Sequence, residues 1–151
     1  MLACTIDVVV TSERDVVLPR YETEGAAGMD LRADLAESVT LLPLGRAKIP
    51  TGLSMAIPMG FEGQVRPRSG MAAKHGLTVL NAPGTIDSGY RGEIKVNLVN
   101  LDPAATLTLR RGDRVAQLVV QPVVRARFVP VDRLPGSERG AGGHGSTGVA
   151  S

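Results

Sequence analysis

Four short segments of this 151-residue chain mix glycine with acidic, basic or hydroxyl side chains, a combination that strand formation alone does not require. In the first, residues 27–33, Asp30 and Arg32 interrupt an apolar stretch, either as an ion pair at a sheet edge or as groups that face a ligand. In the second, residues 66–70, Arg68 precedes Ser69, which can begin a helix. A guanidinium beside a helix N-terminus favours a phosphate oxygen, although a capped helix with a solvent-facing arginine has the same pattern.

The third segment, residues 80–96, is the densest in polar residues and glycine. It predicts two strands joined by about ten residues, more than the two to five of an ordinary hairpin, and long loops often bind ligands. It contains Asp87, a possible base or metal-associated carboxylate, and Tyr90, whose ring could lie against a planar base or a sugar. A glycine-rich connection with a surface carboxylate and a packed tyrosine is the structural alternative. In the fourth segment, residues 111–118, Gln117 lies among apolar neighbours and needs hydrogen-bond partners if it is buried.

Composition argues against several classes of function. The net charge is only +2 with both signs interspersed, so neither nucleic acid nor a membrane surface is indicated as a partner. One cysteine, Cys4, and two histidines supply no internal disulfide and no structural zinc set, which suits a reducing cytoplasm. No stretch is long and apolar enough to span a membrane, and no signal peptide is expected. Residues 140–145 match Gly-x-Gly-x-x-Gly, but without the strand and helix of a dinucleotide site.

The elements that must position these segments are predicted to be short strands. The chain has 18 glycines and 10 prolines, only 3% aromatic residues, and Pro-x-Gly at 43–45, 50–52 and 58–60, which predicts the turns of a β meander. Strands are expected at 5–10, 38–42, 52–57, 77–80, 93–99, 106–109, 115–124 and 127–131. Ile94, Val96 and Leu98 should face the core. One helix is expected from Ser69 to His75, with Ser69 as its cap and Gly76 at its end. The fold class is therefore all-β, a sandwich or jelly roll.

The C-terminal stretch differs in composition from the rest of the chain. Residues 135–151 include six glycines, and Val149 is their only large apolar side chain. Such a segment cannot bury enough surface to fold alone. We therefore expect one domain over residues 1–134 and a flexible glycine-rich arm over 135–151.

Taken in order, the four segments and this arm resemble the five motifs of the homotrimeric dUTPases, the deoxyuridine triphosphate nucleotidohydrolases. The matching stretches are residues 27–31, 67–70, 84–93, 111–117 and 139–148. Each motif alone is weak, but five in order over about residues 20 to 148 make coincidence improbable.

The resemblance implies a distorted jelly-roll sandwich or barrel, a homotrimer with active sites at subunit interfaces, and a cytoplasmic dUTP diphosphatase. Hydrolysis of dUTP to dUMP and pyrophosphate would limit uracil incorporation into DNA and supply dUMP for dTMP synthesis. Mg²⁺ would be held by the three phosphate groups, as is common for this ion, and Asp30 would reach it through water.

The resemblance also implies a role for each site residue. Asp87 would activate the water that attacks the α-phosphorus, and Gln117 and Ser69 would place the water and the α-phosphate. Arg68 and Gly70 would join Ser69 in binding phosphates. The uracil and deoxyribose would contact Asn81, Gly84, Thr85, Ile86, Asp87, Tyr90 and Lys95, with Tyr90 excluding a 2′-hydroxyl.

The arm would close on an active site of a neighbouring subunit. Arg139 and Ser146 would engage the γ-phosphate, and His144, next to Gly145, would cover the base. His144 stands where most family members have phenylalanine, and an imidazole can still stack on uracil.

Two alternatives remain at this point. A dCTP deaminase, or a bifunctional deaminase and triphosphatase, shares the fold, but the complete fifth motif argues against it. A trimer that binds a nucleotide without catalysis, to regulate a partner, is disfavoured by the combination of Asp87, Gln117 and Arg139.

Overall fold

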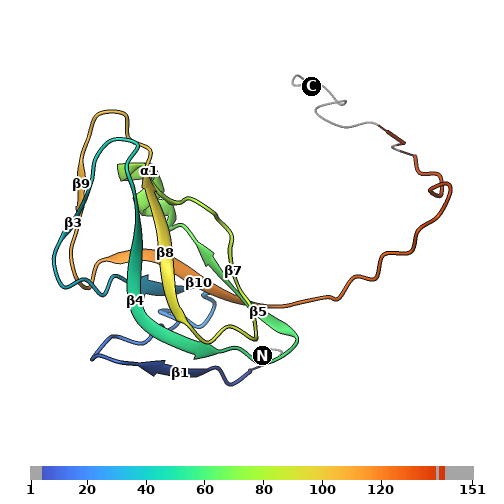
Figure 1. The fold of residues 1–151 in the computed structure, drawn as a ribbon, viewed down its shortest axis with the longest axis horizontal. Coiled ribbons are helices and arrows are strands. Elements are labelled where there is room, and N and C mark those ends of the chain that lie inside the picture. The colour runs from blue at the N-terminus through green and yellow to red at the C-terminus, as the bar shows by residue number, and fades with distance from the viewer. Residues whose placement is uncertain (1–4, 139, 142–151) are drawn as a thin grey trace.

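The computed structural model describes residues 5–138 and 140–141, which form strands, connecting loops and one short helix (Figure 1). One four-stranded sheet has the order β1 (Val9–Ser12), β4 (Arg46–Ala56), β8 (Glu93–Asn100), β6 (Leu77–Val79). The other has the order β2 (Met29–Arg32), β10 (Arg114–Pro122), β5 (Phe61–Arg66), β7 (Gly84–Ile86). Strands β3 (Val39–Leu41) and β9 (Leu107–Leu109) form a separate pair. All the pairings are antiparallel, so the prediction of an all-β fold with one short helix is confirmed.

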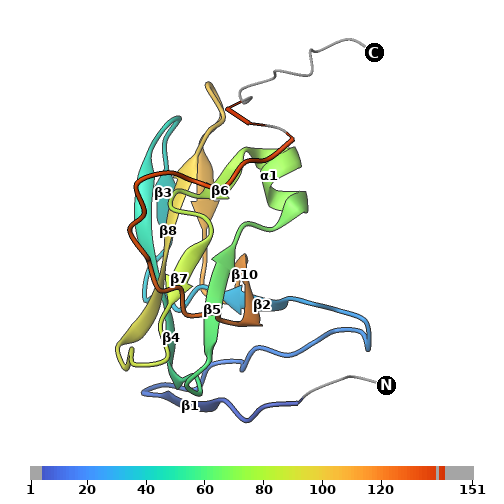
Figure 2. The same ribbon diagram turned by 90° about the vertical axis from the view of Figure 1, so that its right-hand side faces the viewer.

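The core lies between the two four-stranded sheets, which form separate layers in Figure 2. One aliphatic cluster joins Ile49 and Val96 of the first sheet to Leu31 and Leu118 of the second. The predicted alternation along β8 is confirmed, since Ile94, Val96 and Leu98 are each at most 1% exposed. With so few aromatic residues, this cluster is filled mainly by leucine, isoleucine and valine.

The strand order is not that of a meander, because neighbours in each sheet come from distant parts of the chain. Strand β1 begins later than expected, and β5 and β7 were not predicted as strands. The expected strand at 127–131 is wrong: after β10 the chain leaves the body of the molecule (Figure 1), and Phe128 is 92% exposed. A strand needs a partner for its backbone groups, and this stretch has none within the described part of the chain.

Two of the three Pro-x-Gly segments form turns, at 43–45 and 58–60. The third, Pro50–Gly52, is not a turn but lies inside β4, where the register with β8 shifts between Pro50 and Ser54. Gly52 adopts a φ of 70° there, and its amide donates to a carboxylate oxygen of Glu93 at 2.9 Å. Thr51 donates from its hydroxyl to the carbonyl of Ile94 at 2.7 Å. These cross-strand bonds keep the chain in the sheet at an irregularity of the β-bulge kind.

The helix α1 spans Ser69–His75, as predicted. It ends at Gly76, whose left-handed conformation (φ 61°) lets its amide bond to the carbonyl of Ala72. Ser69 does not cap the helix; Arg68 occupies the cap position and makes no side-chain cap bond. Among the described residues, no helix has the length and apolar character needed to cross a membrane.

Candidate active site

The first group of predicted site residues lines a pocket of about 440 Å³ beside the start of α1, here called the α1 pocket. Its lining is Asp30, Arg68, Ser69, Gly70, Met71, Lys74, His75 and Gln117. Asp30 comes from β2, Gln117 lies directly opposite it on β10, and Arg68 follows β5. Sheet pairing therefore brings together residues that are up to 87 positions apart in the chain.

The one acid of the α1 pocket lies between two arginines, Arg68 in the pocket lining and Arg114 beside it. Nε of Arg68 lies 2.7 Å from one carboxylate oxygen of Asp30, and Nη1 of Arg114 lies 3.5 Å from the other. The side chains of Asp30 and Arg68 are only 20% and 25% exposed, so this contact is less screened than a surface ion pair. Two arginines around one carboxylate leave excess positive charge, which suits an anionic ligand.

Gln117 has the partner that its apolar setting demands. Its side-chain Nε2 donates to the carbonyl of Pro67 at 2.9 Å, directly before Arg68. The opposite end of this amide lies against Gly28, and a Cβ at residue 28 would overlap its oxygen. The glycine of the first segment thus makes room for the glutamine of the fourth.

Arg114 was not predicted as a site residue, and a bulge in β10 explains its position. Between Arg114 and Ala116 the register with β2 shifts by one residue, and both Val115 and Ala116 are buried. Because side chains alternate along a regular strand, Arg114 and Gln117 would otherwise face opposite sides of the sheet. The extra residue puts Arg114 on the side of Gln117 and Asp30. The adjacent apolar residues at 115–116 are the only local signal of this arrangement.

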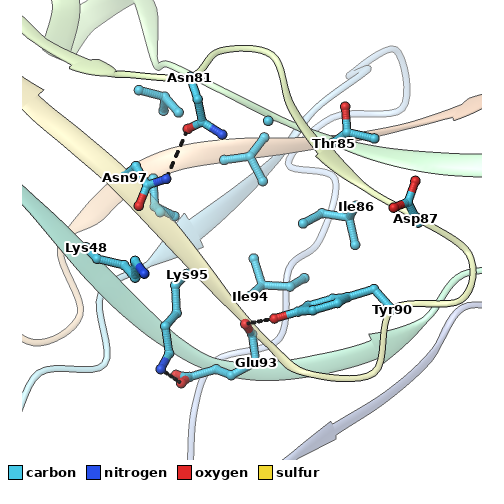
Figure 3. Close-up of a pocket in the computed structure, with 14 residues that line it drawn as sticks. Lys48, Asn81, Thr85, Ile86, Asp87, Tyr90, Glu93, Ile94, Lys95 and Asn97 are labelled. Atoms are coloured by element: carbon cyan, nitrogen blue, oxygen red, sulfur yellow. Dashed lines mark hydrogen bonds and ion pairs between the residues drawn. The ribbon is translucent and has the colours of Figure 1, made fainter.

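The second group of predicted site residues lines a different pocket, of about 460 Å³, here called the β7–β8 pocket (Figure 3). From the predicted set it contains Asn81, Gly84, Thr85, Ile86, Asp87, Tyr90 and Lys95. Strand β7, which pairs with β5, forms part of the connection expected as loop, and the strands predicted at 77–80 and 93–99 pair as β6 and β8. Lys48, Glu93 and Asn97 also line this pocket and were not predicted.

A tight turn carries Asp87 and Tyr90 at one end of the β7–β8 pocket. The Tyr90 amide donates to the Asp87 carbonyl at 3.0 Å, and the Tyr90 hydroxyl donates to the Glu93 carbonyl at 2.9 Å (Figure 3). The guanidinium of Arg91 donates to the carbonyls of Ser88 and Tyr90, both at 2.7 Å. Asp87 itself is exposed, and no ion pair holds it within residues 5–138.

Polar contacts line the remainder of the pocket. Lys95 pairs with Glu93 at 3.3 Å, and the side-chain nitrogen of Asn97 lies 3.4 Å from the side-chain oxygen of Asn81 (Figure 3). Gly84 is buried against Val65 of β5, and a Cβ there would reach ordinary contact distance of both Val65 and Asn81. Amides and backbone groups that face apolar side chains are what recognition of a neutral, planar ligand requires.

The two pockets share no lining residue. Asp30 on β2 and Ile86 on β7 lie on opposite edges of a four-stranded sheet, three strand spacings or roughly 14 Å apart. Within one chain the predicted site is therefore divided in two. Arg139, His144, Gly145 and Ser146 lie outside the described residues.

Comparison with known proteins identifies the family. The family model described as dUTPase matches residues 14–148, and the chain belongs to the dUTPase family. The predictions of the family, of a dUTP diphosphatase and of a jelly-roll fold are confirmed.

Relatives of this chain share more than half of their aligned residues with it. The deoxyuridine 5'-triphosphate nucleotidohydrolase of Thermobifida fusca is 60% identical over 134 residues, which cover 89% of this chain and 74% of the relative. The protein of the same name from Fusobacterium nucleatum is 53% identical over 143 residues, covering 95% and 97%.

Solved structures of phage dUTPases have the same fold. The dUTPase of Staphylococcus bacteriophage 80alpha with dUpNHpp is 28% identical, with a TM-score of 0.86, over 96% of this chain and 100% of that one. A mutant dUTPase of phage phi11 of S. aureus, described as coordinating a structural Mg(II) ion, is 25% identical with a TM-score of 0.77, over 87% and 100%.

Proposed function

We propose that this chain hydrolyses dUTP to dUMP and pyrophosphate, with the deoxyuridine in the β7–β8 pocket and the phosphates against the α1 pocket. The observation that carries the proposal is the chemical difference between the pockets. One offers amides, backbone groups and an aromatic ring, and the other offers a serine hydroxyl, Arg68 and a single carboxylate, with Arg114 beside that carboxylate.

The β7–β8 pocket would read the base and the sugar. The Asn81 side chain and the backbone from Asn81 to Ile86, with that near Lys95, would bond to the uracil edge. Gly84 lets this backbone come close to the base, which would exclude a 5-methyl group and the amino group of cytosine. Tyr90 would lie against the deoxyribose, where a 2′-hydroxyl has no room.

The α1 pocket would hold the phosphates. Arg68 and Arg114, now paired with Asp30, would bind phosphate oxygens, and Ser69 and Gly70 would supply hydroxyl and backbone donors. Donors that are already in place when charge develops stabilise a transition state without reorganisation.

The chemical step would be attack of water on the α-phosphorus. Asp87 accepts a proton from the water while the oxygen of that water bonds to the α-phosphorus. The bond from the α-phosphorus to the α,β-bridging oxygen breaks. Pyrophosphate leaves with that electron pair, and dUMP remains. Gln117 and Ser69 orient the water and the α-phosphate, and the exposed Asp87 carboxylate is open to a water molecule.

Magnesium fits this site when the substrate's phosphates hold it. Among the described residues no three His, Cys, Asp or Glu side chains gather to bind a metal, and Asp30 is the only acid in the α1 pocket. Such an ion takes one or two carboxylates, waters and phosphate oxygens, so Asp30 would reach it through water. When bound, Mg²⁺ neutralises phosphate charge.

A homotrimer would complete the site. We propose that the α1 pocket of one subunit faces the β7–β8 pocket of another, since the two lie on opposite sheet edges of one chain. The arm, residues 135–151, would close over the substrate, with Arg139 and Ser146 at the γ-phosphate and His144 and Gly145 over the base.

In the cell this reaction would take place in the cytoplasm. It would keep dUTP low, limiting uracil incorporation into DNA, and would supply dUMP for dTMP synthesis. No nucleic acid or membrane partner is proposed.

A substrate panel tests the proposal. The protein is incubated with dUTP, dCTP, dTTP or UTP and Mg²⁺, and dUMP and pyrophosphate are measured. We expect release of pyrophosphate from dUTP far above the other three. Equal turnover of dCTP, or none of dUTP, would contradict the proposal and favour the deaminase or the non-catalytic alternative. Mass measurement of the native protein tests the trimer.

A further inference from the structure

The ring of Tyr90 is seated against a residue without a side chain. A Cβ built on Gly92 would lie 2.5 Å from the Tyr90 hydroxyl oxygen, 2.8 Å from Cζ and 3.1 Å from Cε2. Contacts that short do not occur, so the present ring position requires glycine at residue 92. The hydroxyl then bonds to the Glu93 carbonyl at 2.9 Å, which fixes the far end of the ring across the β7–β8 pocket (Figure 3).

The backbone conformation at residue 92 does not require glycine. Its φ is outside the left-handed region, since it is not among the glycines of positive φ, and it is exposed. The three atoms nearest to such a Cβ are all at the outer end of Tyr90, a side chain that is 43% exposed. A methyl group at residue 92 would therefore move the ring and leave the backbone and the core in place.

We infer that Gly92 is a specificity-determining position, which selects the deoxyribose sugar by fixing where the Tyr90 ring lies. This inference rests on the proposed function, in which that ring faces C2′ of the sugar. With glycine the ring is seated close enough to touch deoxyribose and to collide with a 2′-hydroxyl. Once the ring is displaced, the deoxyribose of dUTP loses a packing contact, and the 2′-hydroxyl of UTP no longer collides with the ring. Both changes reduce the preference for dUTP over UTP.

Gly89 provides a matched control in the same turn. It is exposed, its φ is also outside the left-handed region, and apart from its chain neighbours Ser88 and Tyr90 a Cβ there would meet nothing within 4 Å. Gly89→Ala and Gly92→Ala thus make the same change to the chain three residues apart, and the second places its methyl group against the end of the Tyr90 ring.

The test compares kcat/KM for dUTP and UTP in the full-length wild type, Gly89→Ala and Gly92→Ala proteins. We expect the dUTP to UTP ratio to fall about tenfold in Gly92→Ala, in the range of a misplaced contact of one methyl group, and to stay unchanged in Gly89→Ala. An unchanged or increased ratio in Gly92→Ala overturns the inference. A wild type that does not hydrolyse dUTP contradicts the proposed function instead, so the two failures are distinguishable.

A double-mutant cycle gives a second test that does not depend on one variant. Tyr90→Phe removes the atom nearest to the new methyl group and also the bond to Glu93, so it should lower the ratio by itself. Gly92→Ala should then have a smaller effect in the Tyr90→Phe background than in the wild type. Additive effects of the two substitutions on the ratio, or no effect of Tyr90→Phe, would contradict the inference even if Gly92→Ala folded poorly.

Discussion

The β7–β8 pocket and the α1 pocket differ in the chain separation of their residues and in the charge they present. Most of the first comes from residues 79–97, a nearly continuous stretch, and its ion pair joins neighbours on one strand. The second collects Asp30, the residues around Arg68, and Gln117 by strand pairing, and its one acid pairs with Arg68 of the lining and with Arg114 beside it. The proposed selection of a neutral base is thus built locally, whereas the proposed phosphate binding depends on the whole fold.

The largest expected effect separates the chemistry from binding. Asp87→Asn should lower kcat by roughly a thousandfold, because an amide cannot take the proton of the attacking water. Affinity for dUpNHpp, measured by calorimetry, should change little. Asp7→Asn, at an exposed acid outside both pockets, is the control. A comparable loss of affinity and kcat would assign Asp87 to binding rather than to the reaction.

Removal of the arm should have the next largest effect. A chain ending before Arg139 should lose roughly a hundredfold in kcat/KM for dUTP, since it lacks the proposed γ-phosphate contacts of Arg139 and Ser146. Its thermal unfolding should match that of the full chain.

Within the full chain, His144→Phe and His144→Ala test the stacking role. If neither changes affinity or turnover, His144 does not cover the base.

The proposed phosphate binding at the α1 pocket can be weakened without changing the β7–β8 pocket. Arg114→Met should raise KM for dUTP about tenfold, because it removes a cation beside Asp30, and should leave the affinity for deoxyuridine unchanged. Arg110→Met removes an exposed arginine four residues away that lines neither pocket and, unlike Arg114, forms no ion pair with Asp30. Weaker deoxyuridine binding in Arg114→Met would mean that the two pockets are not independent.

The smallest expected effect lies outside both pockets. Amide bonds from Ala105 and then Ala104 hold the pKa of Asp102 below its ordinary value in the turn after β8. A lowered folded-state pKa stabilises the protein above the unfolded-state pKa of about 3.9, and this contribution is lost as the pH falls through the folded-state pKa. Asp102→Ala should therefore lower the melting temperature slightly at neutral pH and not in strong acid, with activity unchanged. An equal decrease in melting temperature in strong acid would contradict this explanation, and Asp102→Asn, which keeps an acceptor, is the control.

Local patterns predicted those parts of the fold that local chemistry determines. The alternation along β8 placed its buried residues correctly, and Gly76 ended the helix because a left-handed residue closes a helix without strain. Pro50–Gly52 misled because bonds from Thr51 and Gly52 to β8 override the turn preference of proline and glycine. Strand β7 was not predicted because it has only three residues, one of them a glycine. So short a segment forms a strand only when it can pair with a neighbouring strand, here β5.

The candidate site also divides into a part that local sequence patterns predict and a part that only the fold determines. The β7–β8 pocket could be recognised as a pocket from an overlong connection with Asp87 and Tyr90 in it. Nothing in the spacing of Asp30, Arg68 and Gln117 placed them together, and only the family resemblance grouped them. Arg114 was missed because its position depends on a shift of register that no residue pattern specifies.

That shift of register also determines what a change in the length of β10 would do. Val115 and Ala116 both face the core, so an apolar residue of similar size at either position keeps the strand as it is. Loss of one of these two positions would instead restore regular pairing, and Arg114 would then lie two residues from Gln117, still on the side of Asp30. At this point of the chain a deletion and a substitution therefore leave the charge on the same side of the sheet and differ in the core: the deletion removes a buried side chain together with the bulge, and the substitution alters packing alone.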